Sequence, residues 1–239
     1  MLFRSIEGAI ADYTAVIGLA GAPAEEVARA LYDRGVTKGQ RGDIEGAIAD
    51  YTAAIGLAGA PAERVAQALN NRGVAKGQNG DVAGEIADYT AAIGLAGAPA
   101  EQVAKALYNR GIVKGQNGDV TGEIADYTAV IGLAGAPAEQ VAQAFYNRGI
   151  RKGQNGDIAA EIADYTAAIG LAGAPAEQVA QARYNRGVTK EQRGDIAGAI
   201  ADYTAVIELA GAPREVIDAA RDRLERVANL VKPNRPSDL

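Results

Sequence analysis

The sequence predicts an all-α protein built from stacked helical hairpins. A 38-residue unit recurs along nearly the whole 239-residue chain, and only five of 38 positions differ between residues 80–117 and 118–155. Each unit contains two stretches with apolar residues at helical spacing, and no stretch has the alternation of a strand. A fixed period of 20–50 residues is typical of supersecondary units that bury their apolar faces against their neighbours.

One helix of each unit begins at a Gly-Asp pair. In the unit that starts at Gly80, Asp81 is an N-cap residue whose carboxylate can accept from the free amides of the first turn. The helix ends before Gly97 and Pro99, because glycine can adopt the left-handed conformation and proline cannot continue a helix. Its apolar face occupies positions i, i+3, i+4 and i+7, namely Ile86, Tyr89, Thr90 and Ile93.

The other helix begins at Pro99, which suits a first turn, and Glu101 lies near the positive end of its dipole. It carries the Tyr-Asn-Arg-Gly group and ends at a Gly-Gln-Asn-Gly turn. Twelve helices follow from the repeat, near residues 5–20, 23–40, 43–58, 61–78, 81–96, 99–116, 119–134, 137–154, 157–172, 175–192, 195–210 and 213–231.

The last helix differs from its predecessors. It lacks Tyr-Asn-Arg-Gly and carries charged residues around an apolar face made of Val216, Ala220, Leu224, Val227 and Val231. A terminal unit needs one polar side, so this helix is predicted to be a cap. The domain organisation predicted is a repeat array over residues 1–212, a capping helix over 213–232 and a disordered tail over 233–239.

The stretch ALYNRGIVKGQNGDVTGEIADYTAVIGLAGAP resembles the tetratricopeptide repeat family, and the resemblance covers roughly residues 5–232. It implies a right-handed α-solenoid of stacked helix–turn–helix repeats. The matching glycines would let paired helices approach closely; they are Gly35, Gly73, Gly111, Gly149 and Gly187. The unit of 38 residues is longer than the family's 34, by about one helical turn, so the buried face stays in phase.

A second departure from the family concerns a small residue of the helix that begins at Gly-Asp. It is Ala in the outer repeats (Ala9, Ala47 and Ala199) and Glu in the middle ones (Glu85, Glu123 and Glu161). A buried carboxylate needs partners. We therefore expect ionic ladders along the array, formed in one repeat by Arg110, Lys114, Glu123 and Asp126.

Composition argues against several function classes. The chain has no Cys and no His, which removes thiolate chemistry and the commonest general base and metal ligand. No catalytic, metal-binding or cofactor-binding motif is present, so a non-enzyme without cofactor is predicted. The net charge of −6 and pI near 4.9 disfavour nucleic acid and anionic membrane surfaces. Glu7 and Asp12 interrupt the apolar N-terminal stretch, so we expect it to be a repeat helix and not a signal peptide, and we expect a cytoplasmic location.

The family's ligand surface is its concave side. Carried over by matching positions, the resemblance implies a protein or peptide partner on the residues Asn71, Lys105, Tyr108, Asn109, Gln116, Gln143, Tyr146, Asn147, Gln154, Tyr184 and Asn185. Asn carboxamides can both donate to and accept from a peptide backbone. The alternative is that Tyr and Asn fill contacts between repeats. The family's clamp for a C-terminal carboxylate is incomplete, because its Lys and Arg partners are absent from the matching positions.

A second function remains open, that of a structural module that self-associates through its ends. The chain starts in a helix of the Gly-Asp type with few charges, and uncovered apolar surface usually marks a contact site. A homodimer through the N-terminal helix is predicted, with Ile6, Ile10, Tyr13 and Ile17 at the interface. The rivals are a monomer in which residues 1–3 fold back over this surface, or a gene that starts upstream.

Overall fold

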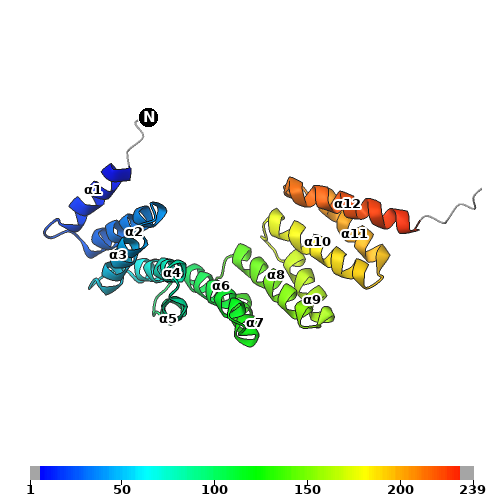
Figure 1. Ribbon diagram of the computed structural model, residues 1–239, viewed down its shortest axis with the longest axis horizontal. Coiled ribbons are helices and arrows are strands. Elements are labelled where there is room, and N and C mark those ends of the chain that lie inside the picture. Colours follow the sequence, from blue (N-terminus) through cyan, green and yellow to red (C-terminus); the bar gives the residue numbers. More distant parts are fainter. Residues whose placement is uncertain (1–5, 232–239) are drawn as a thin grey trace, which may run out of the picture. The chain divides into compact units, whose positions relative to one another are not determined.

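The computed structural model describes residues 6–231, and every regular element within that range is a helix, as predicted (Figure 1). The chain divides into two compact units, Met1–Ala136 and Pro137–Leu239. The strict sequence period gives no sign of this division. Each unit is therefore described by itself.

The first unit contains seven helices: α1 (Ile6–Ile17), α2 (Ala24–Gln40), α3 (Ile44–Gly56), α4 (Ala62–Gln78), α5 (Val82–Ile93), α6 (Ala100–Gln116) and α7 (Val120–Gly132). The second unit contains α8 (Ala138–Gln154), α9 (Ile158–Gly170), α10 (Ala176–Gln192), α11 (Ile196–Ile207) and α12 (Arg214–Val231). The even-numbered helices α2 to α10 follow the Gly-Ala-Pro turn and are called first helices here. The odd-numbered helices α3 to α11 follow Gly-Asp and are called second helices.

The second helices end two or three residues earlier than predicted, at Gly56 and Ile93 in place of residues 58 and 96. The turn explains the difference. Leu57 is already extended, with φ −73° and ψ 116°, and Gly59 has a φ of +80° that favours glycine. The predicted N-caps are confirmed: Asp43 and Asp81 each accept from a backbone amide of the first turn, Gly46 N at 2.9 Å and Gly84 N at 2.8 Å.

Each hairpin closes on a tyrosine of its second helix. A Cβ built on Gly35 would lie 2.7 Å from Cε1 of Tyr51, and one built on Gly73 would lie 2.8 Å from Cε1 of Tyr89. The tyrosines are buried, with Tyr51 4% and Tyr89 1% exposed. The expectation that the matching glycines permit close approach is therefore confirmed, since any side chain there would displace the ring.

Successive hairpins stack through their first helices. In the first unit α2 packs on α4 and α4 on α6; in the second unit α8 packs on α10 and α10 on α12. Within each unit, second helices pack on the first helix that follows, as α3 does on α4 and α9 on α10. Alanines such as Ala66 and Ala104 are fully buried between the helices. We call the surface of α2, α4 and α6, and separately that of α8, α10 and α12, the first-helix face.

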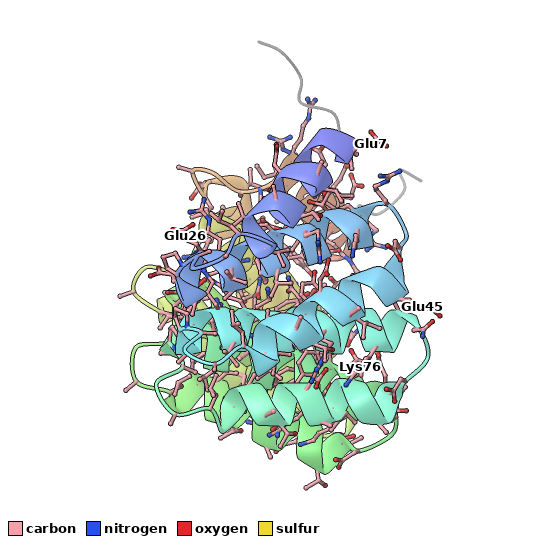
Figure 2. All side chains as sticks on the ribbon, turned by 90° about the vertical axis from the view of Figure 1, so that its left-hand side faces the viewer. Glu7, Glu26, Glu45 and Lys76 are labelled. Atoms are coloured by element: carbon pink, nitrogen blue, oxygen red, sulfur yellow. The ribbon has the colours of Figure 1, made fainter. Side chains whose placement is uncertain are left out.

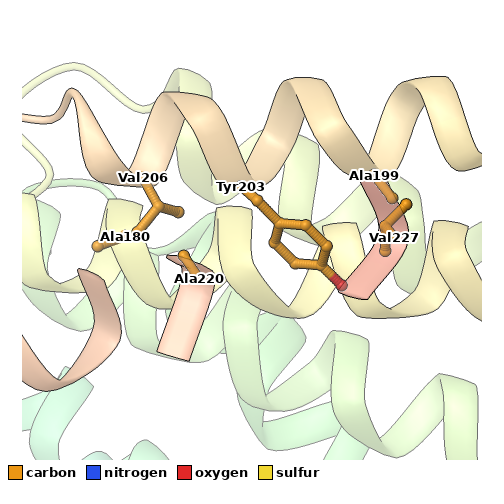
Figure 3. Packing of buried hydrophobic residues seen from close by; sticks show 6 residues of the cluster. All are labelled: Ala180, Ala199, Tyr203, Val206, Ala220 and Val227. Carbon is orange, nitrogen blue, oxygen red and sulfur yellow. The ribbon is translucent and has the colours of Figure 1, made fainter. Parts of the chain in front are cut away.

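The helix α12 packs on α11 at the end of the second unit. Ala220 and Val227 are fully buried against Tyr203 and Val206, and the Tyr203 ring lies between them (Figure 3). Charged residues of this helix such as Arg221 and Glu225 are exposed. This geometry agrees with what a cap requires, although the capping role and the domain limits stay predictions. The predicted tail, and the side chain of Val231, lie outside the described part of the chain.

The helix α1 at the start of the first unit contains no buried residue. Ile6 is 48% exposed, while Ile10, Tyr13 and Ile17 are half-buried. Glu7 projects from the outside of this helix, as Glu26 and Glu45 do from α2 and α3 (Figure 2).

Candidate binding site on the first-helix face

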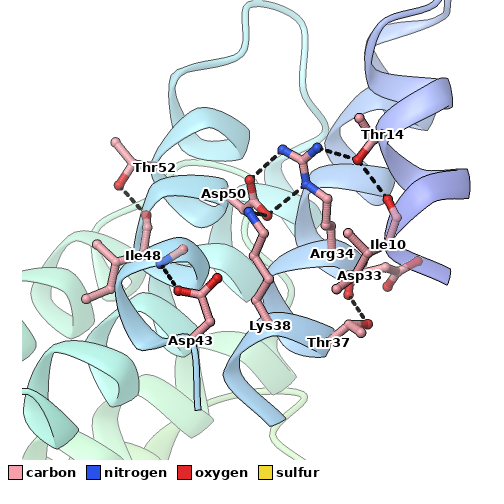
Figure 4. A network of polar contacts seen from close by, with 11 residues as sticks. Ile10, Thr14, Asp33, Arg34, Thr37, Lys38, Asp43, Ile48, Asp50 and Thr52 are labelled. Carbon is pink, nitrogen blue, oxygen red and sulfur yellow. Dashed lines mark hydrogen bonds and ion pairs between the residues drawn. The ribbon is translucent and has the colours of Figure 1, made fainter. Parts of the chain in front are cut away.

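An arginine and a lysine of each first helix hold one aspartate of the following second helix. Arg34 Nε and Nη2 donate to the two carboxylate oxygens of Asp50 at 2.9 and 2.6 Å (Figure 4). Lys38 Nζ lies 2.8 Å from the same carboxylate. Arg34 Nη1 also donates to the Thr14 hydroxyl of α1 at 2.9 Å. One guanidinium therefore ties together three helices, in the bidentate geometry that favours arginine over lysine.

The same cluster recurs in both units. In α4 and α5, Arg72 donates to Asp88 at 2.8 and 2.7 Å and Lys76 lies 2.9 Å away. The equivalent groups are Arg110, Lys114 and Asp126; Arg148, Lys152 and Asp164; and Arg186, Lys190 and Asp202. Burial acts to raise the pKa of the Asp50 carboxyl, but hydrogen bonds from Arg34 and Lys38 outweigh it and hold that pKa below its ordinary value.

Two of the middle-repeat glutamates, Glu85 and Glu161, do not join these ladders in the way the sequence predicted. Glu85 Oε1 accepts from the Tyr89 hydroxyl at 3.0 Å, and Glu161 Oε1 accepts from Tyr165 at 3.1 Å. For these two residues the predicted pairing with Arg and Lys is wrong, because the aspartate one turn further on already occupies both cations. Burial raises the pKa of Glu85, although the hydrogen bond from Tyr89 acts to lower it.

A glycine of the preceding first helix makes room for each of these carboxyl groups. A Cβ on Gly77 would lie within 2.3 Å of Glu85 Oε2, and one on Gly153 within 2.3 Å of Glu161 Oε2. The sequence signals this pairing: where the second helix has Ala199, the first helix has Glu191 in place of glycine. Glu191 Oε2 then accepts from Tyr203 at 2.7 Å and lies 3.4 Å from Arg223.

The first full hairpin has neither carboxyl. Gly39 of α2 faces Ala47 of α3, and a Cβ built on Gly39 would still lie 3.7 Å from the Ala47 Cβ. A cavity of about 350 Å³ is found there. Its walls come from α2, α3 and α4, and the residues are Val36, Gly39, Gln40, Ile44, Ala47, Tyr51, Asn71, Val74, Ala75 and Gln78. The Ala–Glu difference is visible in the sequence, but the cavity that accompanies it is not.

The predicted ligand residues all lie on first helices. Asn71 is on α4; Lys105, Tyr108, Asn109 and Gln116 are on α6; Gln143, Tyr146, Asn147 and Gln154 are on α8; and Tyr184 and Asn185 are on α10. Lys105, Gln116 and Gln154 are exposed, and the others are half-buried.

The structure brings three of them together in the second unit. Tyr146, Tyr184 and Asn185 line one groove of about 320 Å³ between α8, α10 and α12. Gln181, Glu215, Val216 and Ala219 complete its lining. The groove thus combines two aromatic rings, a carboxamide and aliphatic side chains.

Asparagine amides link the tyrosines of successive first helices. Asn71 Nδ2 donates to the Tyr32 hydroxyl at 2.9 Å, and Asn185 Nδ2 donates to Tyr146 at 2.7 Å. The predicted alternative, that Tyr and Asn fill contacts between repeats, therefore describes part of their role. The two amides also interact with the hydroxyls of Tyr51 and Tyr165, and each has a carbonyl oxygen that can accept.

One position of each first helix is a tyrosine (Tyr32, Tyr108, Tyr146 and Tyr184), except in α4, where it is Asn70. Asn70 is fully buried. Its Nδ2 donates to the Gln102 carbonyl oxygen at 3.0 Å, and its Oδ1 has no partner within residues 6–231. Rings pair across each hairpin elsewhere, as Tyr32 does with Tyr51 at a centroid distance of 6.0 Å. Asn109 consequently lacks the tyrosine that its equivalents contact in the preceding repeat.

A separate cavity of about 340 Å³ lies between α1 and α2, at the start of the first unit. Tyr13 and Val16 of α1 form part of its lining. The other residues around it are Glu26, Arg29, Ala30 and Asp33. Of the predicted self-association residues, Tyr13 faces this cavity and Ile6 is the most exposed. Among the described helices none is long and apolar enough to cross a membrane.

Comparison with known proteins confirms the resemblance. The profile of the tetratricopeptide repeat family matches residues 28–61 and 180–213. No curated protein matches the sequence.

Solved structures share the fold. BtubC (BKLC) from P. vanneervenii superposes with a TM-score of 0.69 at 15% identity, over 99% of this chain and 95% of that one. MamA superposes with a TM-score of 0.54 at 19% identity, over 82% of this chain and 96% of that one. The C-terminal part of a TPR repeat-containing protein from Cytophaga hutchinsonii gives 0.60 at 15% identity, over 91% and 88%. At such identities the likeness concerns the fold alone, an α-solenoid of tetratricopeptide repeats.

Proposed function

We propose that this tetratricopeptide-repeat chain is a non-enzymatic scaffold that binds a protein partner, as an extended peptide or a helix, on its first-helix face. The observation that carries the proposal is the groove of the second unit, where Tyr146, Tyr184 and Asn185 converge above Val216 and Ala219. Protein-binding sites combine aromatic anchors with a few oriented polar groups. Tetratricopeptide repeats are general protein-binding modules, which supports the same class of function.

The groove suits a peptide for a chemical reason. Asn185 is held in place because its amide donates to Tyr146, and its carbonyl oxygen remains available to accept from a peptide N–H. The half-buried rings of Tyr146 and Tyr184 offer flat apolar surface at little cost in conformational entropy. The low pI of 4.9 continues to disfavour nucleic acid. The expected compartment remains the cytoplasm.

The test replaces a small residue that lines the groove. After co-purification from the source organism identifies a partner, its affinity is measured by calorimetry for the wild type and for Ala219→Arg, whose side chain fills the groove. Ala201→Arg, on exposed surface of α11, is the matched control. We expect Ala219→Arg to weaken binding at least about tenfold, which corresponds to 1.4 kcal/mol. Equal affinities for both variants and the wild type would show that the partner binds elsewhere.

A second candidate, homotypic association through α1, is favoured by one observation. Ile6 is 48% exposed and no residue of α1 is buried, whereas α3 buries Ala47, Tyr51 and Ala54. A second copy could cover this face in a two-fold dimer. Ile6→Glu with Ile10→Glu should then convert a dimer to a monomer in light scattering, and Ala53→Glu, on exposed surface of α3, should not. A wild type that is monomeric at tens of micromolar would exclude this candidate.

A further inference from the structure

Each hairpin presents a buried tyrosine hydroxyl at one place beside its first helix, and a carboxyl group commonly occupies the space in front of it. Glu85 accepts from Tyr89, Glu161 from Tyr165 and Glu191 from Tyr203, at distances of 3.0, 3.1 and 2.7 Å. In the last case the carboxyl comes from the first helix and not from the second. The position therefore selects a carboxyl group whichever helix supplies it.

At the α2–α3–α4 interface this carboxyl group is missing, and no larger side chain fills the space that it would occupy. Gly39, Ala47 and Ala75 line the cavity where the next interface has Gly77, Glu85 and Val113. Three small residues coincide, and the cavity of about 350 Å³ remains. The cavity is open to solvent, because the exposed side chains of Gln40, Val74 and Gln78 form part of its lining.

A polar group in this cavity also lacks its acceptor. Tyr51 is 4% exposed, and its hydroxyl interacts with the Asn71 amide, which is a donor. The hydroxyl proton of Tyr51 has no acceptor among the residues that the structure describes. Its equivalents Tyr89, Tyr165 and Tyr203 all donate to a carboxylate. The hydroxyl faces the open cavity, where a bound carboxylate would accept from it in place of solvent.

We propose that this cavity is a subsite for a glutamate side chain of a peptide bound to the first-helix face. The inference rests on the proposed function and specifies one chemical feature of the partner. The ligand's methylene groups lie between Val36 and Val74, and its carboxylate takes the place against Gly39 that Glu85 takes against Gly77. Tyr51 donates to it. Val74 is 38% exposed at present and becomes covered by the ligand.

The rim of the cavity suits the backbone on either side of that glutamate. Gln40 of α2 and Gln78 of α4 line the cavity and are exposed, and their carboxamides can both donate and accept. No Lys or Arg lines the cavity. Recognition therefore depends on the tyrosine donor and on shape, as it does for the resident Glu85.

A first experiment tests the site without a peptide. Propionate, which has the length of a glutamate side chain, is titrated into the full chain while the side-chain amide signals of Asn71 and Gln78 are followed by NMR. We expect a saturable shift with an affinity in the millimolar range, as suits so small a ligand.

Two variants test the position of the site. Ala47→Glu should abolish the shift, because the chain then supplies its own carboxyl, and Glu85→Ala should create a second site near Gln116. Both variants are checked by their melting curves. No saturable shift in the wild type, or an unchanged shift in Ala47→Glu, overturns the inference.

A second experiment separates the failure of this inference from failure of the proposed function. A library of random peptides displayed on phage is selected on the wild-type chain. We expect selected peptides to share one glutamate, and their binding to fall at least tenfold when that residue is replaced by alanine or when Ala47→Glu is used. Ala53→Glu, on exposed surface of α3, is the control. Selected peptides that share no glutamate, that bind equally well with alanine in its place, or whose binding is unchanged in Ala47→Glu overturn the subsite alone. Absence of any selected peptide counts against the scaffold function as well.

Discussion

Two interfaces of the first unit, α2–α3–α4 and α4–α5–α6, share a scaffold and differ in what fills it. Both have the Arg–Asp–Lys cluster, with Arg–Asp distances of 2.6 and 2.7 Å. Both bury a tyrosine against a first-helix glycine. At the second interface Glu85 occupies the space in front of the tyrosine, while at the first interface Ala47 leaves it open. The interactions that hold the helices together are therefore separate from the position that varies.

Because of this separation, near-identical repeats can differ at one position while their shared contacts stay the same. A substitution at the position of Ala47 or Glu85 changes a cavity without altering the ion pairs or the glycine–tyrosine contact. Repeat proteins are stabilised mainly by contacts within a repeat and with its nearest neighbours, so such a change stays local. The following predictions test whether the two interfaces share the ion pairs and the glycine–tyrosine contact, and whether they differ at the position of Ala47 and Glu85.

The largest effect is expected for the shared cluster. Asp50→Ala and Asp88→Ala each leave an arginine and a lysine without their anion, and the aspartate side chains are only 5% exposed. Because the cations are themselves partly solvated, we expect each variant to lose about 2–3 kcal/mol in urea unfolding. The two losses should agree. A cost at one interface only would show that the scaffold is not shared.

The tyrosine hydroxyls should separate the two interfaces. Tyr89→Phe leaves the Glu85 carboxyl without its donor, and we expect a loss of about 1–2 kcal/mol. Tyr51→Phe removes a hydroxyl whose proton has no acceptor, and Asn71 keeps its bond to Tyr32. Its cost should be below about 0.5 kcal/mol. Equal costs in thermal and urea unfolding would contradict the difference between the interfaces.

Glycine-to-alanine substitutions should also differ. Gly39→Ala has 3.7 Å of clearance to Ala47 and should gain the usual helix stabilisation of about 0.5–1 kcal/mol. Gly77→Ala would meet the Glu85 carboxyl within 2.3 Å and displace it from Tyr89, so the gain should disappear. In a Glu85→Ala background the gain at residue 77 should return. A gain for Gly77→Ala in the wild-type background would sink this explanation.

The smallest effect concerns pH. Burial raises the pKa of Glu85 above its unfolded value, which is about 4.3. The stability from its neutral form is fully present below that unfolded pKa and is lost as pH rises through the folded pKa. Glu85→Gln should therefore melt at a slightly higher temperature than the wild type at pH 7, with no difference below about pH 4.

The aspartates provide an internal reference for that experiment. Hydrogen bonds from Arg and Lys outweigh burial and hold the pKa values of Asp50 and Asp202 low. Their contribution is present above the unfolded pKa and is lost as pH falls through the folded one. The wild type and Glu85→Gln should consequently lose stability in parallel as the pH falls. An advantage of Glu85→Gln that grows as pH falls would contradict the assigned direction.

Local patterns in the sequence determined the helices, their caps and the stacked architecture. Asp43 and Asp81 were identifiable as N-caps because a cap depends on residues within one turn, and the 38-residue period carried the family resemblance. The partners of Glu85 could not be predicted in this way. Tyr89, Arg72 and Lys76 are all near it in the sequence or on the adjacent helix, and only the packed rotamers decide that the aspartate takes both cations.

The cavity beside Tyr51 and the groove beside Asn185 are likewise decided by tertiary structure. Gly39, Ala47 and Ala75 are ordinary small residues in three separate helices, and their coincidence at one point exists only once the helices pack. Tyr146 and Tyr184 lie one period apart in the sequence, yet α12 has to close the groove before they share it. Periodicity determines which faces are buried, whereas the space left between side chains depends on the sum of volumes from helices distant in sequence.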